Sequence, residues 1–359
     1  MVVRPDGSVW GVGGNSFGQL GLGPDMITST DFIKLFPAGA VTVSTGWGGH
    51  SMLLTQDSSM WVTGMNQHGQ LGDGTEEGKM TYEKVIPDGV KSVAAGSTHS
   101  LVVKLDGSVW TAGYNLSGQL GDGSKINKNV FVKVLLTGAE AVAAGFEHSL
   151  VLNQDDSVWA TGGNYFGQLG TGSTEPKLEF VQVLTSGVKA IAAGGYHSMV
   201  LKQDGTVWAA GNNEHGQLGD RSSDSQASFH LVTSNEMVTS TGGAKAIAAG
   251  YQHSMVLGRD RSLWATGRND CGQLGDGSKL SKYAFLRVAS DVQVVAAGVL
   301  HSMILKVDGT FWATGSNNEG QLGDGSTSEK ITFVKLVQTS EDEDEDHDKN
   351  KNNKNKDGA

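Results

Sequence analysis

The chain has 359 residues, including 52 glycines, 5 prolines and a single cysteine, and its formal net charge is −11. No apolar run approaches the roughly 18 residues that span a bilayer, which argues against an integral membrane protein. The lone cysteine, Cys271, cannot form an internal disulfide, so a disulfide-stapled secreted scaffold is excluded. Glycine and proline together make up 57 of 359 residues, well below the roughly 25–30% typical of aperiodic low-complexity chains.

One motif recurs along the chain at a period close to 50 residues. Seven tryptophans, spaced by 51, 49, 49, 49, 56 and 48 residues, mark its copies: Trp10, Trp61, Trp110, Trp159, Trp208, Trp264 and Trp312. Nine residues after each stands the glutamine of a Gly-Gln-Leu-Gly tetrad, and eleven residues before each except the first stands a His-Ser pair. A fixed period of this length predicts a repeat architecture.

Each unit contains four short runs that are typical of β-strands. In the unit around Trp208 they cover residues 188–194, 197–202, 206–211 and 229–232, with β-branched and aromatic residues between glycine-rich turns. Asp-Gly pairs such as Asp204-Gly205 predict type I′ hairpin turns, with positive φ at both central residues. Seven units of four strands predict an all-β fold, namely a seven-bladed β-propeller with four-stranded antiparallel blades.

Residue size along each unit fits the taper of a propeller blade. The first strand of most units ends in Ala-Ala-Gly, and such small residues suit the crowded hub. The tryptophan lies in the third strand, farther out, where blades diverge. We therefore expect the seven repeated tryptophans to pack between blades and to supply much of the core.

The first unit is incomplete. Residues 1–7 align with residues 199–205, so the chain starts inside a second strand, with no Ala-Ala-Gly run before it. We predict a propeller over residues 1–338 whose N-terminal blade lacks its innermost strand, and a disordered acidic, then Lys/Asn-rich tail over residues 339–359. A truncated gene product or a partial array is the hypothesis that follows, and an open inner edge would invite another strand.

The repeated pattern Ala-Ala-Gly-x-x-His-Ser…Asp-Gly-x-Val-Trp-Ala-Thr-Gly-x-Asn-x-x-Gly-Gln-Leu-Gly-Asp-Gly resembles the regulator of chromosome condensation repeat. The resemblance implies a seven-bladed propeller. The family's namesake is a nucleotide exchange factor for the small GTPase Ran and binds nucleosomes. A plant relative is an ultraviolet-B photoreceptor that uses tryptophans beside arginine; here only Gly46-Trp47-Gly48-Gly49-His50 comes near that motif, without arginine.

Three departures separate this chain from the namesake. The largest insertion is about seven residues, between Gln217 and Gln273, too short for the namesake's wedge-like hairpin, and no basic arm precedes the first blade. Without residues 341–359, the chain has 30 acidic and 23 basic residues, a net charge of −7, so nucleic acid is not expected as a partner. We therefore expect a non-enzymatic protein-interaction scaffold. The alternatives are an exchange factor for a small GTPase and an accessory domain of a ubiquitin ligase.

Residues that vary between units indicate where a protein partner would bind. The turn before each His-Ser pair shares one face with the connection that follows Gly-Gln-Leu-Gly, and repeat propellers bind partners on such faces. Tyrosine and tryptophan are frequent interaction hot spots. The candidate partner-binding residues are Trp47, Phe146, Glu147, Tyr196, Tyr251 and Gln252. The alternative is that they only pack against their neighbours.

No catalytic residue, cofactor or metal site is expected. The His-Ser pairs occupy equivalent places in separate blades and fit hydrogen-bonded scaffold residues. The match of residues 14–18 to a Gly-x-Ser-x-Gly nucleophile elbow is a coincidence of the repeat, because no strand-to-helix turn follows. The acidic residues 342–346 faintly resemble a calcium loop but lack its glycine and final glutamate. No signal peptide and a lone thiol favour a cytoplasmic or nuclear location.

Overall fold

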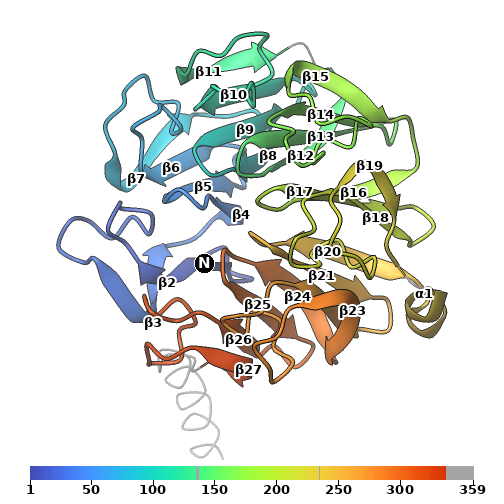
Figure 1. The fold of residues 1–359 in the computed structure, drawn as a ribbon. Coiled ribbons are helices and arrows are strands. Elements are labelled where there is room, and N and C mark those ends of the chain that lie inside the picture. The colour runs from blue at the N-terminus through green and yellow to red at the C-terminus, as the bar shows by residue number, and fades with distance from the viewer. Residues whose placement is uncertain (135–136, 234, 337–359) are drawn as a thin grey trace, which may run out of the picture.

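The computed structural model describes residues 1–134, 137–233 and 235–336, which form seven antiparallel sheets arranged around a central axis (Figure 1). The predicted seven-bladed β-propeller is confirmed. The predicted tail at 339–359 lies outside the described residues. We number the blades 1 to 7 in chain order.

Each blade is a simple meander from the axis outward. Blade 1 contains β1 (Val2–Val3), β2 (Val9–Gly14) and β3 (Thr28–Phe36); blade 2 contains β4 (Ala40–Thr45), β5 (His50–Thr55), β6 (Met60–Gly64) and β7 (Lys79–Ile86); blade 3 contains β8 (Val90–Ala95), β9 (His99–Lys104), β10 (Val109–Gly113) and β11 (Lys128–Val134). Blade 4 contains β12 (Ala139–Ala144), β13 (His148–Asn153), β14 (Val158–Gly162) and β15 (Lys177–Leu184); blade 5 contains β16 (Val188–Ala193), β17 (His197–Lys202), β18 (Val207–Gly211) and β19 (Gln226–Leu231). Blade 6 contains β20 (Ala244–Ala249), β21 (His253–Gly258), β22 (Leu263–Gly267) and β23 (Lys282–Ala289); blade 7 contains β24 (Val292–Ala297), β25 (His301–Lys306), β26 (Phe311–Gly315) and β27 (Lys330–Lys335).

Blade 1 has three strands, as predicted. Its innermost strand β1 is two residues long and pairs only with β2, through Val2 opposite Trp10 and Val3 opposite Val9. The chain begins close to the axis, in the region where the other six blades place their first strands (Figure 1).

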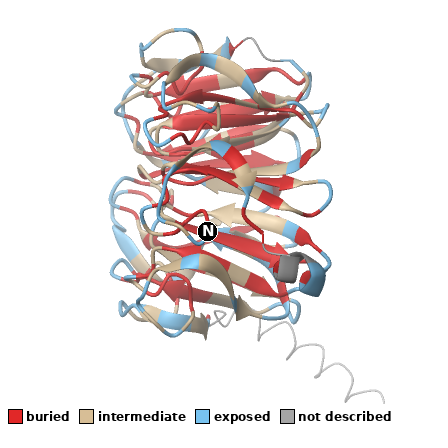
Figure 2. Cartoon of the chain, turned by 45° about the vertical axis from the view of Figure 1, so that its right-hand side comes forward, coloured by how far each residue is buried: buried red, intermediate tan, exposed pale blue. Residues whose placement is uncertain are grey.

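Six of the repeated tryptophans, Trp61, Trp110, Trp159, Trp208, Trp264 and Trp312, pack against clusters of buried residues from successive blades, and Trp10 is itself buried. The buried residues lie mainly along the strands of the stacked sheets (Figure 2). Trp61 of blade 2, for example, meets Phe36 of blade 1 edge to face, with ring centroids 5.4 Å apart. Each indole nitrogen donates to the hydroxyl two residues before it, as Trp110 does to Ser108 at 2.9 Å. The ring thus fills the wedge between sheets while its one polar atom stays hydrogen-bonded.

The hairpin turns between second and third strands differ from the type I′ turns that we predicted. In the Asp6-Gly7 turn only Gly7 has positive φ, at 77°. The Gly7 amide donates to the Arg4 carbonyl, and the Arg4 amide donates to the Ser8 carbonyl. This is a longer loop with one left-handed residue, because the Asp6 carboxylate accepts the Ser8 amide at 2.8 Å and holds the aspartate in an ordinary conformation.

The extra residues of the longest unit form a short helix that the sequence did not predict. Helix α1 (Asn235–Thr241) lies between β19 and β20. Met237 of this helix is buried against Val232 and Met199 in the core of blades 5 and 6. The insertion therefore packs onto the rim and does not project as a wedge.

Candidate protein-interaction site

Neighbouring blades are joined by a repeated set of three polar groups. Nε2 of His99 lies 2.9 Å from Oγ of Ser149 in the next blade, and this hydroxyl donates to the carbonyl of Gln119 at 2.7 Å. Because the serine proton goes to the carbonyl, the histidine must be the donor, and its own proton is on Nε2. The same contact recurs at four further junctions, His50–Ser100, His148–Ser198, His197–Ser254 and His253–Ser302.

The second ring nitrogen of these five histidines is buried and has no hydrogen-bond partner among the described residues. Burial lowers the pKa of His148 to about 3 and that of His197 to about 4. The expectation of hydrogen-bonded scaffold histidines is thus met at Nε2 of these five residues. These neutral, enclosed rings connect blades and offer no base to a substrate in solvent.

The glycine that ends the Ala-Ala-Gly pattern makes room for the histidine of the same blade. A Cβ on Gly145 would lie 2.2 Å from Cε1 of His148 and 2.7 Å from the carbonyl of Gly194 in the next blade. Glycine is therefore required by close packing at the hub, in addition to the taper that we inferred from residue size.

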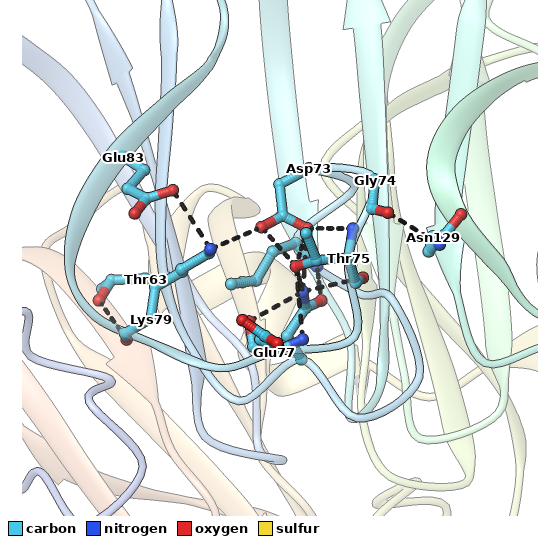
Figure 3. A network of polar contacts seen from close by, with 10 residues as sticks. Thr63, Asp73, Gly74, Thr75, Glu77, Lys79, Glu83 and Asn129 are labelled. Carbon is cyan, nitrogen blue, oxygen red and sulfur yellow. Dashed lines mark hydrogen bonds and ion pairs between the residues drawn. The ribbon is translucent and has the colours of Figure 1, made fainter.

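The turns between first and second strands and the connections between third and fourth strands lie on one side of the propeller, which we call the loop face. Each connection is braced by a buried asparagine and, in most blades, an aspartate. In blade 2, Asn66 donates to the Asp73 carboxylate at 3.0 Å, and Lys79 forms an ion pair with it at 3.3 Å (Figure 3). Burial raises the pKa of Asp73, but hydrogen bonds from Thr75 and Asn66 and the Lys79 charge outweigh burial and hold this pKa below its usual range.

The aromatic candidates from four different turns meet in one cluster at the centre of the loop face. Trp47 of blade 2 lies edge to face with Tyr251 of blade 6, with centroids 5.8 Å apart. Phe146 lies 5.4 Å from Tyr196 and 6.1 Å from Tyr251. Blades 2 and 6 are not neighbours in the ring, so these side chains reach across the axis. All four residues are half-buried.

The two polar candidates lie at the edge of this cluster. Burial, followed by the neighbouring Tyr251 and the Glu147 charge, raises the pKa of Tyr196 to about 12, so its hydroxyl is protonated at neutral pH. Oε1 of Gln252 accepts a hydrogen bond from Arg268 at 2.9 Å. The structure therefore brings all six candidate residues into one region.

Sequence reasoning missed further members of the site. Phe166, from the connection between β14 and β15, packs on Tyr196 with centroids 5.4 Å apart, and Tyr165 beside it is 63% exposed. Arg268 forms an ion pair with Asp270 at the polar edge. These residues occupy variable positions of the Gly-x-Asn-x-x-Gly segment. Variation between units identified the candidates in the turns between first and second strands, and the same criterion applied to this segment would have identified these residues too.

The chemistry of the described residues is that of a binding surface. Within the ranges that the structure covers, no group of three or more His, Cys, Asp or Glu side chains could hold a metal ion. In that same part of the chain, no helix is long and apolar enough to cross a membrane. Trp47 contacts Tyr251 in the cluster.

Seven sheets surround a central axis, and hydrogen bonds join the histidine of one repeat to the serine of the next. This arrangement defines a β-propeller of the chromosome-condensation-regulator type. The chain belongs to the RCC1-like domain family, whose model matches residues 8–350.

Individual relatives align over short stretches. The bovine secretion-regulating guanine nucleotide exchange factor is 35% identical over 89 residues, and its mouse counterpart is 44% identical over 68 residues. These segments cover 23% and 18% of this chain and 19% and 15% of the relatives, so the chain spans a small part of either protein.

The fold match extends much farther. Prp20p from Saccharomyces cerevisiae, a protein described as binding Gsp1p and histones, superimposes with a TM-score of 0.83 over 95% of this chain and 88% of its own, at 22% identity. This likeness concerns the fold.

Proposed function

We propose that the chain is a protein-interaction platform that binds its partner through the aromatic cluster on the loop face. One observation carries the proposal: Trp47, Phe146, Tyr196 and Tyr251 come from four blades and meet as half-buried rings at one place. Half-buried tryptophan and tyrosine bordered by charged groups are the usual composition of an interface hot spot.

The polar edge supports the same proposal. Glu147 and Asp270 provide negative charge beside the rings, and Arg268 is held by Asp270 and Gln252. Tyr165 projects from the neighbouring connection and enlarges the apolar surface. A partner that covers the rings with apolar side chains and meets these charges at its rim would match this surface.

Affinity purification of the tagged full-length chain tests the proposal. We expect Trp47→Ala combined with Tyr251→Ala to reduce recovery of the main co-purifying protein at least tenfold, because hot-spot truncations typically cost about 2 kcal/mol or more. Tyr283→Ala on the outermost strand and Leu105→Ala in a hairpin turn are matched controls, since both side chains are exposed away from the cluster. Unchanged recovery by a double variant that unfolds at the wild-type temperature would contradict the proposal.

A second candidate function is nucleotide exchange on a small GTPase. The identity to secretion-regulating guanine nucleotide exchange factors in two species favours it. Release of a fluorescent guanine nucleotide from a panel of purified GTPases separates the two functions. A platform leaves the release rate unchanged, whereas acceleration at a molar ratio well below one would identify an exchange factor. A cytoplasmic or nuclear location remains a prediction with either function.

A further inference from the structure

Five of the seven repeated tryptophans have a basic side chain over one face of the ring. The guanidinium carbon of Arg4 lies 4.1 Å from the ring centroid of Trp10, and Nζ of Lys306 lies 4.5 Å from that of Trp312. Lysines also lie over three further rings, Lys84 over Trp61, Lys104 over Trp110 and Lys202 over Trp208. A cation in this place is attracted by the negative face of the indole.

Trp159 of blade 4 has no such cation among the described residues. The cations come from two positions of the repeat, namely the last residue of the second strand and the residue of the outermost strand that pairs with the tryptophan. In blade 4 these positions hold Asn153 and Gln182. Trp264 of blade 6 also has no cation over its ring, but Arg287 pairs with it. Blade 4 is therefore the one described blade without a basic residue at either position.

A cavity of about 200 Å³ lies beside the half-buried Trp159 ring, between the outermost strands β11 and β15. Its lining includes Val134 of blade 3, and Phe180 and Glu179 of blade 4. Pockets for drug-sized ligands measure about 300–1,000 Å³. This cavity is therefore sized for a single side chain, with an aromatic wall and a carboxylate.

Glu179 supplies an uncompensated negative charge at this cavity. A Cβ on Gly123 would lie 3.1 Å from Oε1 of Glu179, so the carboxylate lies over the connection of blade 3. In the part of the chain that the structure describes, Glu179 forms no hydrogen bond or ion pair through its carboxylate. The neighbouring Asp122 is occupied by hydrogen bonds from Ser124 and by an ion pair with Lys128 at 3.4 Å. Uncharged residues replace Glu179 at the same bridge in four other blades, as Val130, Ser228, Ala284 and Thr332.

Lys133 also borders the cavity, but its charge lies on the other side of blade 3. This lysine pairs with Trp110, and directly paired residues of a sheet point to the same face. Val134, the next residue, packs into the core between blades 3 and 4. Hydrogen bonds from Ser108, together with the Lys133 charge, hold the pKa of Asp106 below its usual range. The ammonium group is therefore directed toward the hairpin turn of its own blade and does not occupy the Trp159 ring.

We propose that this cavity binds the guanidinium group of an arginine side chain from a partner polypeptide. The guanidinium stacks on the Trp159 ring, as Arg4 does on Trp10, and forms an ion pair with Glu179. Arginine fits better than lysine, because its planar group both stacks on an aromatic ring and binds a carboxylate through two N–H groups. β11 and β15 are each the last strand of their sheet, so the backbone of a partner has access to their outer edges.

Nitrogen-15 NMR of the full-length chain tests the proposal. Labelling only the eight tryptophans gives one indole N–H signal for each, and Trp159→Phe and Trp264→Phe assign two of them. The probe is the capped tripeptide acetyl-Gly-Arg-Gly-amide. We expect the probe to shift the Trp159 signal in a saturable manner. The Trp264 signal is the internal control and should stay constant, because blade 6 has Ala284 at the place of Glu179.

Changes of charge show which groups hold the probe. The same tripeptide with citrulline, a neutral isostere of arginine, should bind at least fivefold more weakly, because it makes neither the ion pair nor the cation–π contact. Glu179→Gln should weaken binding of the arginine probe about two- to fivefold. Glu214→Gln, at an exposed carboxylate of blade 5, is the matched control and should change nothing. Asn153→Lys restores the cation of the repeat and should weaken the arginine probe at least threefold.

Several results would overturn the proposal. These are an unmoved Trp159 signal, equal affinity for the citrulline probe, or unchanged affinity in a Glu179→Gln variant that unfolds at the wild-type temperature. Tighter binding of free arginine than of the capped probe would make the ligand a small molecule and not a polypeptide. The double variant Trp47→Ala and Tyr251→Ala should bind the arginine probe normally, so this test does not depend on the proposed platform.

Discussion

At the scale of single residues, the hairpin turns show one position at which the repeat is locally strained. Glycine occupies the left-handed position of the Asp-Gly turns, but Ser58, Asp156 and Arg261 occupy it in other blades, with φ of 60°, 63° and 69°. A left-handed conformation costs a non-glycine residue about 1–2 kcal/mol. The aspartate before it and the backbone bond to the next blade hold each turn in place despite this cost.

Ser58→Gly should therefore stabilise the protein. Relief of the left-handed strain exceeds the extra chain entropy of glycine, and we expect a gain of about 0.5–1 kcal/mol in the free energy of unfolding. Urea denaturation followed by tryptophan fluorescence measures the gain as a higher midpoint with an unchanged slope. Gly107→Ser is the reverse control and should destabilise, because a Cβ there would lie 2.9 Å from the Gly138 amide nitrogen. A lower midpoint for Ser58→Gly would contradict the strain argument.

At the scale of elements, blade 1 has fewer paired strand positions near the axis than the other blades. The innermost strand of a complete blade forms five paired positions with the second strand, as β16 does with β17. β1 pairs at two positions with β2 and has no inner neighbour among the described strands. The blade relies on the packing of Val9 and Trp10 in the core and on the contact between Phe36 and Trp61.

Amide hydrogen exchange should be fastest in this blade. We expect peptides that cover residues 1–14 to exchange well before peptides that cover residues 99–113, because fewer ladder bonds must open. Mass spectrometry after timed deuteration measures the difference within one sample. Equal protection of the two segments would show that the three-stranded blade is as stable as a complete one.

At the scale of the whole molecule, five enclosed histidines, His50, His99, His148, His197 and His253, make the propeller sensitive to acid. Burial lowers the pKa of each to about 3 or about 4, from an ordinary value of 6.5. The unfolded chain takes up protons on these residues near pH 6.5, whereas the folded chain does not until the pH is much lower. The free energy of unfolding therefore falls as the pH drops below about 6.5.

We expect acid unfolding between about pH 6 and pH 4, with uptake of several protons. Each histidine contributes roughly 3 kcal/mol to the loss, and five of them together are comparable to the total stability of a typical domain, about 5–15 kcal/mol. The pH dependence of the urea midpoint gives the number of protons. His148→Gln keeps a donor for Ser198 and should reduce the uptake by about one. A midpoint that is constant from pH 7 to pH 5 would rule out this coupling.

The period of the sequence was sufficient to predict the ring, the incomplete blade and the wedge role of the tryptophans, because these depend on contacts that every unit repeats. The turn conformation was mispredicted, since the Asp6 carboxylate holds its own residue out of the left-handed region. From the sequence, the members of the aromatic cluster could be predicted as variable positions, but their contacts with one another could not. Trp47 and Tyr251 belong to blades that are not adjacent, and their contact depends on how the turns bend over the axis.

The histidine, serine and glutamine contacts all run in one chain direction. The donor histidine and the accepting Gln carbonyl come from one repeat, and the serine comes from the next. A single repeat consequently supplies the serine for the contact with the preceding repeat and the histidine and glutamine for the contact with the following one. No repeat contains a complete contact by itself. Duplication or loss of a whole unit by recombination leaves matching halves on both sides of the splice. A few extra residues between the strands also leave the joint intact, because His197 and Ser254 meet although the longest unit carries helix α1 between them. Complete joints are therefore gained or lost only with whole units.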